Sequence, residues 1–69
     1  MEQRLTAIWY PTSGCVGING FPLGRSEIHR PALTWATAVK IGHRVARETG
    51  YAVELTDALY RWNITFEPR

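Results

Sequence analysis

The feature that most limits the folds open to this chain is one long segment with the spacing of an amphipathic helix, residues 31–49. Pro31 suits the first helical turn, where the N–H that proline lacks would have no partner. Gly50 suits the left-handed residue that commonly follows a helix. The sequence therefore predicts a helix from about Pro31 to Thr49. A lone helix cannot bury its apolar face by itself, so the rest of the chain must supply a surface for it to pack on.

The segments before and after the helix have the two-residue alternation of β-strands. Residues 4–10 and 51–56 alternate and are rich in aromatic and β-branched side chains, as strands are. Residues 59–67 alternate almost perfectly between apolar and polar side chains. A turn at Asp57-Ala58 would join the last two segments, so we expect an antiparallel hairpin at the end of the chain.

Turn-forming residues dominate the segment 11–26, which contains four glycines and two prolines. Asn19-Gly20 is the strongest hairpin signal in it, because both central positions of a type I′ turn need a positive φ. This signal predicts a short hairpin that pairs residues 16–18 with residues 21–23. The alternative is one long ordered loop.

Together these segments predict a single α+β domain over residues 1–69, in the order β-(ββ)-α-β-β. It would have two layers, with one α-helix packed on a small antiparallel sheet of three to four strands. We expect the following residues to form the core: Leu5, Ala7, Trp9, Trp35, Val39, Ala46, Val53, Leu55, Trp62, Ile64 and Phe66.

The apolar side chains of the predicted helix occupy well over half of its helical wheel. One sheet face covers a stripe only a little wider than about 100°. The remaining apolar side chains need a second cover, and a second copy of the chain is one candidate. We therefore predict a homodimer, with Ile41 and Val45 in its interface.

The residues that carry catalysis or bind metals are sparse. Cys15, His29 and His43 form no closely spaced pair of the kind that structural zinc sites use. A chain of 69 residues also leaves little room for a nucleophile, its orienting group and a substrate cleft. We expect no enzymatic activity, no metal and no cofactor.

The predicted location of the protein is the cytoplasm. Cys15 is the only cysteine, so no internal disulfide can form and a reducing compartment fits best. The N-terminal residues lack the basic flank and apolar core of a signal peptide. No apolar run approaches the length of about 20 residues that a membrane span needs, so we expect no membrane partner.

The charged residues and the glycine-rich segment are compatible with two alternative functions. The formal net charge is +2, and Lys40, Arg44 and Arg47 share one face of the predicted helix, so a nucleic-acid-binding module is one alternative. The other is a sponge for a phosphorylated ligand. Backbone N–H groups of the glycine-rich segment would hold the anion together with Arg25 and Arg30.

Protein binding is the function that the composition favours most. Trp, Tyr and Arg dominate interface hot spots, and the chain has three Trp and three Tyr, with Lys40 the only lysine among eight Lys and Arg residues. One thin core cannot bury all of these groups, so we predict that the chain binds a larger protein. The predicted contact residues are Tyr10, Phe21, Arg25, Arg30, Arg44 and Arg47.

In size and composition the chain resembles the small stand-alone proteins of bacteriophages and other mobile elements. Many of those bind and block a host protein, including host defence proteins. The resemblance implies an inhibitor of a host defence protein. It rests on no residue motif, so it assigns a role to no residue.

Overall fold

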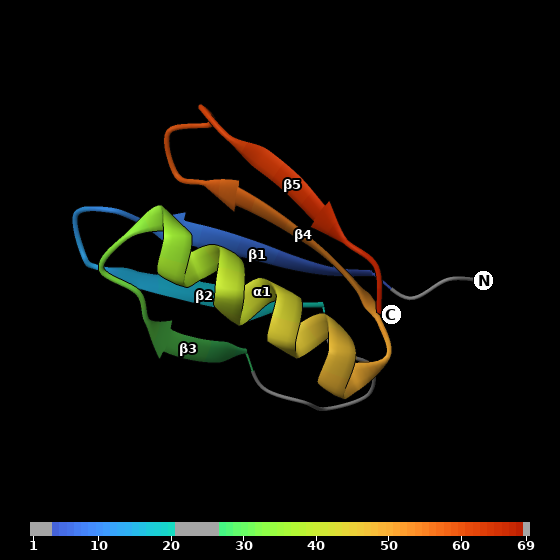
Figure 1. The fold of residues 1–69 in the computed structure, drawn as a ribbon. Helices are drawn as coiled ribbons and strands as arrows, with labels where there is room; N and C mark the ends of the chain where they lie inside the picture. Colours follow the sequence, from blue (N-terminus) through green and yellow to red (C-terminus); the bar gives the residue numbers. More distant parts are fainter. Residues whose placement is uncertain (1–3, 21–26, 69) are drawn as a thin grey trace.

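The computed structural model describes residues 4–20 and 27–68. One helix packs on one face of a five-stranded sheet (Figure 1), so the predicted α+β class is confirmed. The elements in chain order are β1 (Arg4–Tyr10), β2 (Cys15–Asn19), β3 (Ile28–Pro31), α1 (Trp35–Thr49), β4 (Ala52–Asp57) and β5 (Asn63–Phe66).

The sheet is mixed and wider than predicted. Its strand order is β3-β2-β1-β4-β5, and β1 pairs with β4 in parallel while the other neighbours are antiparallel. The expected antiparallel sheet of three to four strands is therefore wrong in strand number and in this pairing. The cause is the route of the helix. Strands β3, β1 and β4 run in the same direction, and the long connection through α1 returns the chain to the far side of β1, as parallel strands require.

Strand β2 occupies the middle of the glycine-rich segment. Its residues Val16 and Ile18 pair with β1 on one side and with Arg30 and Ile28 of β3 on the other. Because both edges of β2 are occupied in this way, the hairpin predicted between residues 16–18 and 21–23 is wrong. Residues 21–23 themselves lie outside the described residues.

The helix begins later than predicted and ends where predicted. Pro31 is the last residue of β3, and the N-cap is Thr34, whose side chain accepts a hydrogen bond from the Thr37 N–H. A threonine in extended conformation at this position satisfies one of the free N–H groups of the first turn. Gly50 ends the helix at φ 76°, and its N–H donates to the Ala46 carbonyl. The αL conformation explains why a glycine stands there.

The wide sheet covers both flanks of the helix. Val45 is buried in the core cluster, and Ile41 packs against that cluster from a partly buried position. The described strands β2 and β3 contribute Val16, Ile18 and Ile28 to the same cluster or its border. The apolar arc for which the sequence predicted a second chain is thus largely covered within one chain, and Val45 has no exposed side chain to offer a dimer.

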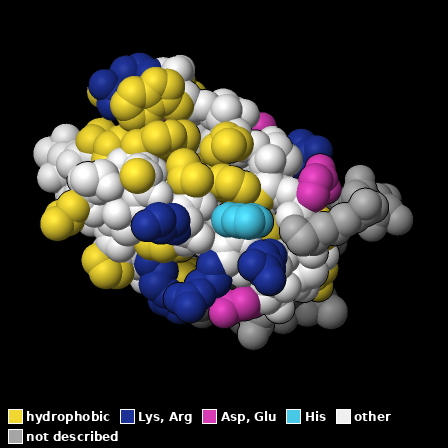
Figure 2. Space-filling model, in the orientation of Figure 1, with side chains coloured by type: hydrophobic (Ala, Val, Ile, Leu, Met, Phe, Trp, Pro, Cys, Tyr) yellow, Lys and Arg dark blue, Asp and Glu magenta, His cyan; other side chains and the backbone are white. Residues whose placement is uncertain are grey.

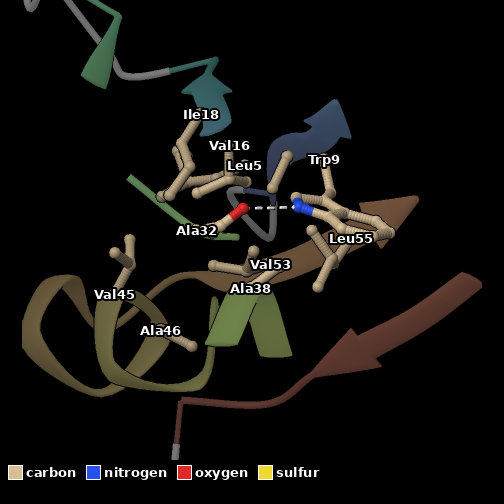
Figure 3. Packing of buried hydrophobic residues seen from close by; sticks show 11 residues of the cluster. Leu5, Trp9, Val16, Ile18, Ala32, Ala38, Val45, Ala46, Val53 and Leu55 are labelled. Atoms are coloured by element: carbon tan, nitrogen blue, oxygen red, sulfur yellow. Dashed lines mark hydrogen bonds between the residues drawn. The ribbon is translucent and has the colours of Figure 1, made fainter. Parts of the chain in front are cut away.

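The core lies between α1 and the sheet, and Figure 3 shows its packing. Its buried hydrophobic residues are Leu5, Ala7, Trp9, Val16, Ile18, Ala32, Ala38, Val45, Ala46, Val53 and Leu55. Six of the predicted core residues are in this set, and Trp35, Val39 and Phe66 pack against it from partly buried positions. Trp62 and Ile64 were predicted inside but are 45% and 39% exposed, because β5 is an edge strand that the helix covers only in part.

Helix α1 approaches β5 closely at one point. A Cβ atom on Gly42 would lie 2.9 Å from Phe66 Cε2, closer than carbon atoms pack. Glycine at this helix position therefore makes room for the Phe66 ring. Phe66 in turn lies opposite Val53 in the ladder between β4 and β5, so the contact anchors the edge strand to the core.

Trp9→Phe tests the anchoring of the helix entry to the central strand. The Trp9 indole Nε1 donates a buried hydrogen bond of 2.8 Å to the Ala32 carbonyl (Figure 3). Phenylalanine leaves that carbonyl unpaired and a small void beside it. We expect the free energy of unfolding, measured by urea denaturation, to fall by about 2–4 kcal/mol. Trp35→Phe, which removes a partly exposed indole, is the control and should cost less. An equal or larger loss for the control would contradict the role given to this hydrogen bond.

Candidate functional site

Three connections of the chain gather at one end of the domain (Figure 1). They are the turn of residues 11–14 after β1, residues 32–34 after β3 and the loop of residues 58–62 after β4. These three strands run in one direction, so their carboxyl ends share an edge of the sheet. The chain leaves β1 toward β2 on one side and leaves β4 toward β5 on the other. Because Trp9 at the end of β1 is opposite Asp57 at the end of β4, the connections that follow these two strands begin side by side.

Trp9 joins these connections to one another. Its carbonyl accepts a 2.8 Å hydrogen bond from the Ala58 N–H, and its indole donates to the Ala32 carbonyl. The indole ring also contacts two other tryptophans, with centroid distances of 5.8 Å to Trp35 and 6.4 Å to Trp62. A further hydrogen bond, from the Ala32 N–H to the Gly14 carbonyl, links the helix entry to the turn after β1. The three connections therefore form one connected unit.

Asp57 holds the loop of residues 58–62 from inside. Its carboxylate is fully buried and accepts hydrogen bonds from the Arg61 N–H at 2.6 Å, the Trp62 N–H at 3.1 Å and Arg61 Nε at 2.9 Å. Burial raises the pKa of the Asp57 carboxyl, but the hydrogen bonds from Trp62 and Arg61 and the guanidinium charge outweigh that effect, and the pKa lies below its ordinary value. The carboxylate therefore stays ionised and orders the loop.

Four large apolar side chains remain exposed at this end. Their exposed fractions are 40% for Tyr10, 83% for Leu33, 62% for Leu59 and 82% for Tyr60. We call this set the end surface. A pocket of about 120 Å³ lies within it, between the turn after β1 and the loop after β4. Its lining residues are Tyr10, Pro11, Thr12, Ser13, Ala58 and Leu59.

The conformation of Tyr60 is costly for an aromatic residue. Its φ is 57°, in the left-handed region, and it is the one described residue other than glycine with a positive φ. An L-residue loses about 1–2 kcal/mol in this conformation. The side chain gains little in return from the core, because it is mostly exposed. Strain of this kind persists where the surroundings impose it, and it is enriched at functional positions.

The helix carries a separate group of cations on its solvent side. Lys40, Arg44 and Arg47 are exposed, and Figure 2 shows basic side chains along this face, with acidic and histidine side chains among them. Arg44 Nε lies 3.8 Å from Glu48 Oε2. A hollow of about 450 Å³ is lined by His43, Arg44, Arg47 and Glu48. All of these lining residues belong to α1, so among the described residues the hollow has no opposing wall.

The structure disperses the predicted contact residues. Tyr10 is part of the end surface, Arg30 is exposed on the edge strand β3, and Arg44 and Arg47 are on the helix. Phe21 and Arg25 lie outside the described residues. The four described members therefore come from three separate elements, β1, β3 and α1.

The exposure of Leu59 and Tyr60 was not predicted from the sequence. Both lie in the segment 59–67, whose alternation predicted a strand. The observed strand begins only at Asn63. The signal for a loop was Asp57, since an Asp can accept hydrogen bonds from the N–H groups of the following residues.

The candidate ligands for a metal or a nucleophilic dyad do not converge. Cys15 and His29 lie on the outer sheet face, opposite Tyr10 and Gly17 respectively, whereas His43 is on the helix and stacks on Phe66 at 5.6 Å. Across residues 4–20 and 27–68, no group of three or more His, Cys, Asp and Glu side chains is placed to hold a metal ion. In the same part of the chain, no helix is long and apolar enough to cross a membrane.

No known protein family, curated protein or solved structure matches this chain. The interpretation of the end surface therefore depends on its own geometry.

The depressed pKa of Asp57 predicts an acid-dependent stability. As the pH is lowered, the unfolded chain binds a proton at this carboxyl before the folded chain does. The contribution of Asp57 to the free energy of unfolding is therefore complete above the unfolded pKa of about 3.9. It is lost as the pH falls toward the lower pKa of the folded chain. We expect the urea concentration at the unfolding midpoint to decrease as the pH is lowered below about 5. Asp57→Asn should lower the midpoint at neutral pH and reduce the acid loss. Glu48→Gln, which removes an exposed carboxylate, should behave as the wild type. An unchanged acid profile for Asp57→Asn would contradict this account.

Proposed function

We propose that this chain is a small protein-binding domain whose contact surface is the end surface. The observation that carries the proposal is that large apolar side chains stay exposed on a loop that a buried carboxylate and a buried tryptophan hold in place. A bare hydrophobic group on a soluble domain costs solubility, and contiguous exposed groups of this kind typically mark interaction sites. A surface that is ordered in advance also loses less conformational entropy on binding.

The size of the pocket indicates a protein partner rather than a metabolite. Pockets for drug-sized ligands measure about 300–1,000 Å³, whereas this one measures about 120 Å³. It has room for a single side chain. Tyr10, Pro11 and Leu59 are among its apolar lining residues, and Thr12 and Ser13 are lining residues that carry hydroxyls. Tyr60, next in the chain to Leu59, would add a broad aromatic contact beside the inserted side chain.

On this proposal the chain acts by occupying a surface of a larger protein, without catalysis. Blocking such a surface makes the chain an inhibitor, in line with the resemblance to small phage and mobile-element proteins. A bacterial defence protein is then the first class of partner to test, and the place of action is the cytoplasm.

A nucleic-acid-binding module remains the second candidate, because Lys40, Arg44 and Arg47 are all exposed on one side of α1. Convergent cations would release counterions on binding and give a steep salt dependence. The pairing of Arg44 with Glu48 reduces the local positive charge. The glycine-rich ligand site finds less support, since Gly17 lies inside strand β2.

Affinity capture from bacterial lysate with matched variants tests the proposal. Tyr60→Gly and Leu59→Ser each remove one apolar group from the end surface, and Lys40→Glu/Arg47→Glu reverses charge on the helix as the control. We expect a protein retained by the wild type to be retained at least about tenfold less by the end-surface variants and equally by the helix variant. Loss only with the helix variant, in a salt-dependent manner, would favour nucleic acid. Equal retention by all variants would contradict the proposal.

Tyr60→Gly also separates binding from folding. Glycine removes the left-handed strain of Tyr60 and loses about 0.5–1 kcal/mol through its flexible unfolded state. We expect the variant to be as stable as the wild type or up to about 1 kcal/mol more stable, as measured by urea denaturation. Lost binding with retained stability would assign Tyr60 to the contact surface. A clear loss of stability would show that the Tyr60 side chain supports the fold instead.

A further inference from the structure

The two edges of the sheet differ in their protection against pairing with another strand. Strand β3 carries Arg30 and ends in Pro31, which has no N–H to donate. Charges and proline are the usual means of blocking an edge. Strand β5 has the sequence Asn-Ile-Thr-Phe, with neither a charge nor a proline. Among the described residues, no strand covers its outer side.

The hydrogen-bond pattern shows which backbone groups β5 leaves free. The Asp57 N–H donates to the Trp62 carbonyl at 3.2 Å, so this opposed pair is a hydrogen-bonded one. Such pairs alternate along an antiparallel ladder, and Ile64 and Phe66 therefore also point their backbone groups at β4. The backbone N–H and C=O groups of Asn63 and Thr65 point outward. The short side-chain contact from Asn63 Nδ2 to Thr56 Oγ1, 2.7 Å, agrees with a non-hydrogen-bonded pair at that position.

We propose that β5 pairs in antiparallel fashion with β5 of a second copy, centred on Ile64. The outward backbone groups of Asn63 then meet those of Thr65 in the second copy, and the reverse pair follows by symmetry. If the register shifted by one residue, backbone N–H and C=O groups that point toward the second copy would lie opposite residues whose groups point toward β4. Only every second register therefore allows hydrogen bonds between the copies. Of these, the register centred on Ile64 pairs residues 63–65 of the two copies and also places Trp62 opposite Phe66 and Arg61 opposite Glu67.

The side chains around β5 are self-complementary in this register. Trp62, Ile64 and Phe66 oppose Asp57, Leu55 and Val53 and so lie on the helix side of the sheet. Across the two-fold axis that relates the two copies, Ile64 lies opposite Ile64 of the second copy, and Trp62 lies opposite Phe66 of the second copy. Trp62 and Ile64 are the partly exposed members, so pairing covers apolar surface that the chain leaves open. Aromatic and β-branched pairs across strands are stabilising.

The charges at the ends of β5 match as well. Arg61 precedes the strand and Glu67 follows it, so antiparallel pairing brings the basic end of one copy beside the acidic end of the other. Arg61 stays half-exposed although Asp57 holds its Nε, and its guanidinium lies 4.7 Å from the centre of the Trp62 ring. A parallel arrangement would place like charges together. The pattern thus selects a second copy of this chain, in this orientation, over an unrelated strand.

Thr65→Pro tests the pairing by sedimentation equilibrium over a wide range of concentrations. The Thr65 N–H points away from β4, so proline removes a contact to the second copy and leaves the ladder within the chain intact. We expect the wild type to approach twice the mass of one chain and Thr65→Pro to stay at the mass of one chain. Thr65→Val, which keeps the N–H, should behave as the wild type. A wild type that stays monomeric, or a dimer that survives Thr65→Pro, overturns the proposal.

Ile64 gives a test that does not depend on any single variant folding well. Ile64→Lys and Ile64→Glu each oppose like charges across the axis, so each should be monomeric, whereas their equimolar mixture should regain dimers. In a Cys15→Ser background, Ile64→Cys should form an intermolecular disulfide on mild oxidation, because residues opposed at a non-hydrogen-bonded position have Cα atoms about 4.5 Å apart. Thr65→Cys should not, because its symmetry mate is a diagonal neighbour at about 7–8 Å. No recovery on mixing, or equal cross-linking at both positions, contradicts this register.

Discussion

The position of Trp9 at the end of the central strand determines how the rest of this structure is arranged. Strand β1 is the middle strand of the sheet and pairs in parallel with β4, and its last buried residue is Trp9. The backbone of Trp9 holds the loop after β4, and its indole holds the entry to the helix. The helix can therefore begin only where β1 ends. Because of this, the loops that follow β1, β3 and β4 are ordered together rather than separately.

Asp57 extends this order to the surface. A carboxylate without partners would be costly in the core, but three donors from Arg61 and Trp62 satisfy it. The same donors fix the loop in which Leu59 and Tyr60 are exposed. The protein thus places a buried charge and a strained tyrosine next to each other at one end of the sheet. Neither feature helps the packing of the core, and both are explained if the loop presents a contact surface.

The sequence predicted the elements that depend on the periodicity and end residues of a single segment. Alternation located β1 and β4 to within a residue, and Gly50 located the end of the helix. The sequence did not reveal β3, because Ile28–Pro31 is too short to show a period and includes a proline. Nor did it reveal the parallel pairing of β1 with β4, which joins segments that are far apart in the chain. The excess of apolar groups was predicted correctly, but its place was not. A five-stranded sheet covers Ile41 and Val45, and the excess lies instead at Leu33, Leu59 and Tyr60.

Amide hydrogen exchange, measured by NMR on the free protein, tests most directly whether the end surface is ordered before any partner binds. The amides of Arg61 and Trp62 donate to a buried carboxylate, and the Ala58 amide donates to Trp9. We predict that these three amides exchange as slowly as amides of the central strand, since they would open only with the core. Exchange at the rate of an unstructured peptide would show that the loop is not held in place and would contradict the account.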